Sequence, residues 1–202
     1  MIEAFYRRAC VAATCGAILI PVMMAMASDV HAQSNSTPAT TGSAMPDATA
    51  SGTVAGKTRP ADAGLLRDIA HANLAEIATG QLAVEKASDP KVKEFAQQMV
   101  DDHTKALTDV QQLAQTKAVK LPTEPDLKHK AAMTKLKTMS GASFDKSYVK
   151  TAGVGDHVAT EKLLKKTQSS AQDADVKALA TKMLPVVQGH LTHARELDNM
   201  KK

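Results

Sequence analysis

Apolar residues recur every three or four positions along the chain from residue 63 onward, which is the spacing of one face of an α-helix. The positions between them are filled by Ala, Leu, Lys, Gln, Glu and Met, all good helix formers. No window shows the sustained alternation of apolar and polar residues that marks a strand. The pattern predicts an all-α domain over residues 63–200.

Capping and breaking residues divide this domain. Asp62 is a predicted N-cap, and Asp89 followed by Pro90 ends one helix and begins the next. Gly141 is expected to end a short helix, and Ser143 to cap the helix that follows. The predicted helices cover about 63–87, 90–118, 124–140, 143–170 and 173–200.

Connection lengths predict how these helices pack. Tight loops join the first helix to the second and the last two to each other, so each pair should form an antiparallel hairpin. The layout is that of a ferritin-like four-helix bundle with one long crossover carrying a short extra helix. The segments Val92–Ala96 and Val176–Ala180 also resemble each other. Either a hairpin was duplicated or two amphipathic helices share a composition.

Polar residues interrupt the apolar stripes near the middle of each long helix. Glu76, His103 and His190 stand on their stripes, and His157 lies beside the fourth. Because helix midpoints share one level in an antiparallel bundle, these side chains are expected in one layer. Imidazole and carboxylate are usual ligands of divalent transition metals, so the four residues predict a site for one such ion. The alternative is a buried polar network that fixes the register of the bundle.

Two glycines, Gly153 and Gly155, lie inside the predicted helix just before His157. A glycine within a helix costs about 1 kcal/mol relative to alanine. Their presence indicates either a closely packed neighbouring helix or a local distortion.

Other titratable residues surround the predicted layer. Asp102 and Asp156 each directly precede a histidine and therefore point about 100° away from it on the helix. Both are expected either behind the site or at the surface. His193 follows one turn after the last histidine and is expected either in the site or facing solvent. His71 is predicted to be partly exposed and His129 to lie on the surface.

The N-terminal residues 1–32 have the features of a cleavable signal peptide. Arg7–Arg8 precede the apolar run Ala9–Ala27, and Val30–Ala32 fits a cleavage site. The alternative is an uncleaved anchor, because the run is just long enough to span a bilayer, although Pro21 interrupts it. A periplasmic location is the prediction.

Residues 33–62 are rich in Ser, Thr, Ala, Gly and Pro and are expected to form a disordered linker, either a plain tether or a wall-binding segment. The two cysteines, Cys10 and Cys15, fall within the signal peptide. The mature chain therefore offers no thiolate nucleophile, cysteine ligand or disulfide.

Charge and composition exclude several functions. The net charge of +4 is mild, and aromatic residues make up 2% of the chain, whereas nucleic-acid binding calls for a concentrated basic face or stacking rings. No nucleophile–base pattern, phosphate-binding loop or haem motif is present, so an enzyme is disfavoured. The mature chain contains no predicted integral membrane span, and no helix has the bulky apolar face of a membrane-surface binder. An envelope component or a protein remains as a partner, and the oligomeric state is left open.

Several motifs resemble an exported bacterial family known as domain of unknown function 4142. They are Ala70–Ile77, Phe95–His103, Ser140–Asp145 with Tyr148, Asp156–His157, and Leu184–Pro185 followed by His190. The resemblance implies a ferritin-like fold and a periplasmic or outer-membrane-associated location, without an established activity. The recurring polar positions of the family match Glu76, Asp102, His103, Asp145, His157 and His190.

The wider ferritin-like group often carries a di-iron site built from Glu and Glu-x-x-His. This chain has Val100 and Val187 three residues before His103 and His190, so it departs from that pattern. A non-enzymatic binding or envelope-associated protein is the first functional hypothesis. The second is a metal-binding, redox-active protein that holds a single ion mainly through imidazoles.

Overall fold

The computed structural model describes residues 58–200, and within this range the chain is helical without strands, which confirms the predicted all-α class. The predicted signal peptide and nearly all of the predicted linker lie outside the described residues. The helices are α1 (Pro60–Lys86), α2 (Pro90–Thr116), α3 (Leu127–Lys137), α4 (Gly141–Tyr148), the π-helix η1 (Val149–Asp156), α5 (His157–Ser170) and α6 (Ala174–Met200).

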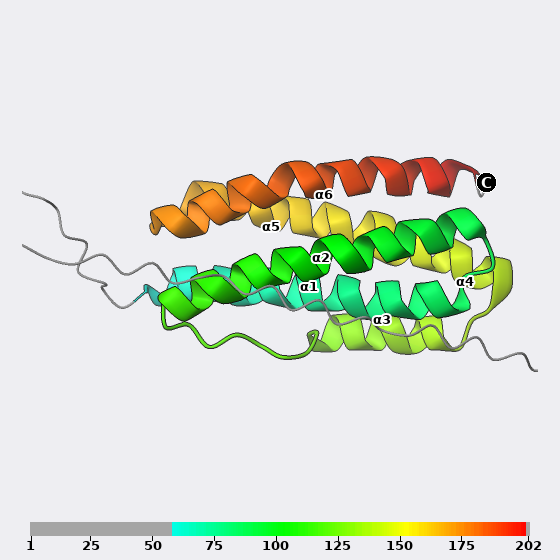
Figure 1. Ribbon diagram of the computed structural model, residues 1–202, viewed down its shortest axis with the longest axis horizontal. Coiled ribbons are helices and arrows are strands. Elements are labelled where there is room, and N and C mark those ends of the chain that lie inside the picture. Colours follow the sequence, from blue (N-terminus) through cyan, green and yellow to red (C-terminus); the bar gives the residue numbers. More distant parts are fainter. Residues whose placement is uncertain (1–57, 201–202) are drawn as a thin grey trace, which may run out of the picture. The chain divides into compact units, whose positions relative to one another are not determined.

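The elements α4, η1 and α5 follow one another without a break and form one rod (Figure 1). Helix α1 packs along α2, and α6 packs along η1 and α5, so the two predicted hairpins are present. Contacts between α2 and α6 and between α1 and α5 join the hairpins, while α3 lies against α1 (Figure 1). No described helix is long and apolar enough to cross a membrane.

Two predicted helix starts are confirmed. The Asp89 carboxylate accepts a hydrogen bond from the backbone N–H of Lys91, and Pro90 is the first residue of α2. Asp173 accepts from the backbone N–H groups of Asp175 and Val176 at the start of α6. Each carboxylate satisfies N–H groups that a helix start leaves unpaired.

Two other predicted starts are wrong. Helix α1 begins at Pro60, so Asp62 lies inside its first turn rather than at its cap. Helix α4 begins at Gly141, which has φ of 57°, instead of at Ser143. The glycine therefore starts a helix, because its left-handed conformation makes the turn that follows Ser140.

Two buried aspartates connect the hairpins. The carboxylate of Asp62 in α1 accepts the N–H groups of Gln172 and Asp173 in the α5–α6 loop, at 3.1 and 3.2 Å. Asp145 in α4 accepts the N–H groups of Ser88 and Asp89 in the α1–α2 loop, both at 3.0 Å. Each hairpin therefore caps the loop of the other.

The apolar core consists of two clusters with a polar layer between them. One contains Phe95, Met99 and Tyr148, and the other contains Ile69, Val110, Leu164 and Val187 among others. Along each long helix the polar residues predicted from the stripes fall between the members of the two clusters. All four, Glu76, His103, His157 and His190, are at most 4% exposed.

Both explanations offered for the glycine pair hold. The helix is distorted, since both residues belong to the π-helix η1. A neighbouring helix also comes close, because a Cβ atom on Gly153 would lie 3.1 Å from the Cβ of Ala194 in α6. A π-helical turn inside an α-helix is frequent at functional sites.

Candidate metal centre

Three histidines from three rods meet in the polar layer. His103 comes from α2, His157 from the junction of η1 and α5, and His190 from α6. The ring centroids are 5.4 Å apart in every pair, so the rings form a nearly equilateral triangle. One ring nitrogen of each lies within 4.8 Å of one ring nitrogen of both others.

The tautomer of His103 is set by Asn73 on α1. The amide nitrogen of Asn73 donates to the carbonyl oxygen of Ile69 at 2.8 Å, so its Oδ1 is the atom that faces the imidazole. His103 Nδ1 lies 3.0 Å from this oxygen and must donate to it. Nε2 of His103 is therefore left with a lone pair.

His157 is held by the π-helix. Its Nδ1 lies 3.0 Å from the carbonyl oxygen of Ala152, five residues back in η1, whereas its backbone N–H bonds to Val154. A carbonyl oxygen only accepts, so Nδ1 carries the proton. Nε2 of His157 is then the second nitrogen with a lone pair.

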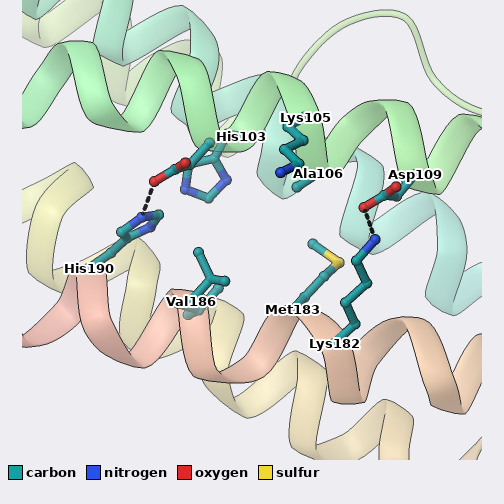
Figure 2. A pocket seen from close by; sticks show the side chains of 10 residues that line it. His103, Lys105, Ala106, Asp109, Lys182, Met183, Val186 and His190 are labelled. Carbon is teal, nitrogen blue, oxygen red and sulfur yellow. Dashed lines mark hydrogen bonds and ion pairs between the residues drawn. The ribbon is translucent and has the colours of Figure 1, made fainter.

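His190 is oriented by Asp102, the neighbour of His103. The Nε2 of His190 lies 2.9 Å from Asp102 Oδ2 and donates to it (Figure 2). Nδ1 of His190 is buried and has no hydrogen-bond partner. Asp102 was expected either behind the site or at the surface; it contacts a histidine of the cluster, and its side chain is 40% exposed.

These outward hydrogen bonds leave three lone pairs at the centre of the triangle. Nε2 of His103 and Nε2 of His157 are 3.4 Å apart, too close for two lone pairs unless a proton or a cation lies between them. Two imidazoles on one tetrahedral ion, with bonds of about 2.0–2.1 Å, have their nitrogens about 3.3–3.4 Å apart. The observed separation fits this arrangement.

The histidines are in their neutral, ligating form near neutral pH. Burial lowers the pKa of His103 well below its usual value, and the neighbouring His157 and His190 lower it further. Burial also lowers the pKa of His157, to about 4, although its bond to Ala152 opposes the shift. The pKa of His190 is lowered by burial against the opposing effect of Asp102.

Glu76 is in the same layer but on the outer side of His157. Its Oε1 lies 3.3 Å from Nδ1 of His157, the nitrogen that faces away from the other two rings. Burial first, and the charge of Asp156 second, raise the pKa of Glu76 well above its usual value. The structure thus brings together three of the four predicted ligands and sets the fourth behind one of them.

A buried tyrosine adjoins this carboxyl group. The hydroxyl group of Tyr148 has no hydrogen-bond partner, and its pKa is raised by burial and by the charge of Glu76. Sequence reasoning did not identify Tyr148 as part of the layer. The same is true of Asn73, although it stands on the α1 stripe one turn before Glu76.

The remaining histidines lie outside the triangle. His193 is half-buried and packs edge-on against Phe95, with ring centroids 5.1 Å apart. His71 is half-buried, as predicted. The surface prediction for His129 is wrong, because this residue is half-buried and its Nδ1 contacts Asp126 at 2.8 Å.

A groove between α2 and α6 leads to the triangle (Figure 2). Its volume is about 150 Å³, and His103 and His190 line its inner end. Ala106, Met183 and Val187 are among its apolar lining residues. The cluster is therefore buried but next to an opening.

Fold and site together define an all-helical protein with a buried three-histidine cluster. The chain belongs to the family described as domain of unknown function (DUF4142), whose sequence model matches residues 46–197. This match confirms the resemblance in the sequence motifs. No curated protein and no solved structure matches the chain.

Proposed function

We propose that this protein is an exported metal-binding protein that holds one divalent transition-metal ion on His103, His157 and His190. The observation that carries the proposal is the direction of the ring protons. Each imidazole donates outward, to Asn73, Ala152 or Asp102, and presents its other nitrogen to the centre. An orienting hydrogen bond on the outer nitrogen is the usual accompaniment of a metal-ligating histidine.

A purely structural polar network explains these contacts less well. Such a network stabilises a core only when every buried donor and acceptor has a partner. Here Nδ1 of His190 is buried without one, and the Nε2 atoms of His103 and His157 face each other with lone pairs. A cation at the centre would satisfy all three nitrogens at once.

The type of ligand limits which metals the site would hold. Three imidazoles without a thiolate suit zinc, copper, iron or nickel. The valines Val100 and Val187 stand where a di-iron protein would carry glutamates, which favours a single ion. Three protein ligands leave at least one coordination position open. The same centre could support redox chemistry if iron or copper is bound.

Location and fold complete the proposal. The signal-peptide features of residues 1–32 support a periplasmic location, free or associated with the outer membrane. Two antiparallel hairpins joined through a crossover helix support a ferritin-like four-helix arrangement. We propose both as the setting in which the site works.

The test is the metal content of the untagged protein purified from the periplasm, beside a His103→Ala, His190→Ala double variant. We expect close to one ion per chain in the wild type and none in the double variant, with helical circular dichroism retained. A His129→Ala, His193→Ala double variant is the matched control and should keep its metal. No bound metal after incubation with iron, copper, manganese and zinc would refute the proposal.

A further inference from the structure

The groove between α2 and α6 is well placed to serve the open coordination position of the proposed metal site. Of the three histidines, His103 and His190 line the groove and His157 does not. His157 thus lies on the side of the cluster away from the opening. A fourth ligand that enters through the groove would arrive between His103 and His190.

Charge indicates what kind of ligand belongs there. Three neutral imidazoles contribute no negative charge, so a divalent ion among them would keep its full charge of about +2. Glu76 does not reach the centre, because its carboxyl group lies behind His157, with Oε1 3.3 Å from the outer nitrogen Nδ1. A negatively charged ligand in the open position would therefore be stabilised more than a neutral one.

The lining of the groove is compatible with an anion. Asp102 is bonded to His190, and Lys182 pairs with Asp109 at 2.8 Å. Lys105 also lines the groove, and its ammonium group has no ion pair among the described residues (Figure 2). The two lysines and the two aspartates of the lining balance in formal charge, so an anion meets no net negative charge along the approach, and Lys105 offers it an ammonium group without an ion pair in the described part of the chain.

Size limits the ligand further. A cavity of about 150 Å³ accommodates a molecule about as large as benzene. Ala106, Met183 and Val187 contribute apolar walls to the groove. A small, weakly hydrated anion suits such walls better than a strongly hydrated or multiply charged one, because less solvation is lost on entry.

We infer that the groove binds a small monovalent anion that completes the coordination of the ion held by His103, His157 and His190. The inference rests on the proposed metal site. It adds to that site a class of ligand, a route of entry and a residue of the groove, Lys105, whose positive charge favours the bound anion.

The experiment uses the mature protein loaded with cobalt(II), whose visible absorption reports coordination number and ligand type. Cobalt stoichiometry is measured first, and sodium azide is then titrated while the spectrum is recorded, with sodium sulfate, a strongly hydrated divalent anion, holding the ionic strength constant. We expect a saturable change of the visible bands. The variant Ala106→Leu, which fills the groove beside His103, should keep its cobalt but bind azide at least about tenfold more weakly.

Two further variants locate the effect. Lys105→Gln should weaken azide binding severalfold without changing cobalt stoichiometry, whereas Ala178→Leu, on an exposed position of α6 outside the groove, should change neither. A chain that binds cobalt but shows no spectral change with azide overturns the anion site and leaves the metal site standing. Azide binding that Ala106→Leu leaves unchanged overturns the groove as the route. A chain that binds neither cobalt nor any of the metals tested for the proposed function overturns the metal site and this inference together.

Discussion

The hydrogen bond between Asp102 and His190 predicts a change in metal affinity that is separable from any change in stability. Asp102 accepts from Nε2 of His190 at 2.9 Å and so keeps the lone pair of Nδ1 directed at the cluster. In the variant Asp102→Ala this acceptor is lost. The imidazole can then move its proton to Nδ1, which is no longer available to a metal.

The expected magnitude follows from the place of Asp102 behind the ligand. Removing such an orienting carboxylate typically costs about 10–100-fold in metal affinity. The side chain of Asp102 is 40% exposed, so its loss should change the free energy of unfolding of the metal-free protein by no more than about 1 kcal/mol. Affinity should therefore fall far more than stability.

The assay is a competition titration of zinc against a chromophoric chelator, with urea unfolding of the metal-free protein alongside. The control is Asp101→Ala, because Asp101 is an exposed neighbour whose carboxylate bonds to Gln97 and not to a histidine. An equal loss of affinity in both variants would reduce the effect to a general loss of negative charge. Unchanged affinity in Asp102→Ala would refute the orienting role.

Two further outcomes follow from the buried layer, and a third from the glycines of the bundle. The metal-free protein should lose stability as the pH falls from about 6.5 towards 4, because the unfolded chain takes up protons that the folded His157, with its pKa near 4, does not. Urea unfolding at pH 7 and pH 5 measures this loss, and His157→Gln should reduce it. Glu76 changes the stability in the opposite direction with pH, since its raised pKa makes the folded protein hold a proton that the unfolded chain releases above about pH 4.5. Glu76→Gln should therefore gain stability relative to the wild type as the pH rises. A difference in unfolding free energy that stays constant with pH would contradict the reasoning. Gly189→Ala, on an open face of α6, should stabilise the protein by up to about 1 kcal/mol in thermal unfolding, whereas Gly153→Ala should not, because its new Cβ would meet Ala194 at 3.1 Å.

Sequence periodicity predicted the helical class and the two hairpins because both follow from local patterns. The 3.6-residue spacing marks each buried face, and the Asp89–Pro90 pair marks a helix start by its own chemistry. The start of α1 could not be predicted in the same way. Aspartate is a residue type typical of N-caps, but the carboxylate of Asp62 accepts a hydrogen bond from a loop more than a hundred residues away. Only the tertiary structure shows that partner.

The sequence predicted that the residues of the candidate site share one layer, but it did not predict how their side chains are oriented. Midpoint positions on four stripes placed Glu76 and the three histidines at one level, and the structure brings the histidines into contact. The direction of each ring depends on Asn73, on Asp102 and on a backbone carbonyl group in a π-helix. The glycine pair before His157 indicated a close neighbouring helix or a local distortion, but no sequence pattern indicates which carbonyl oxygen a side chain will reach.

The loops of the two halves of the domain make matching contacts. Asp62 and Asp145 each cap the loop of the opposite hairpin, and the loop positions that they bind have the same separation along the chain as Val92 and Val176. This reciprocal contact supports an ancient duplication over a chance similarity of composition.

The same separation of positions also relates the two helices that face each other across the groove. At that same separation, His103 corresponds to Val187 and His190 corresponds to Ala106. Each histidine of the α2–α6 pair therefore has a small or apolar counterpart on the facing helix, and both counterparts line the groove. The groove side of the cluster therefore carries no further imidazole, and three imidazoles with an open side are the arrangement that the proposed metal site requires.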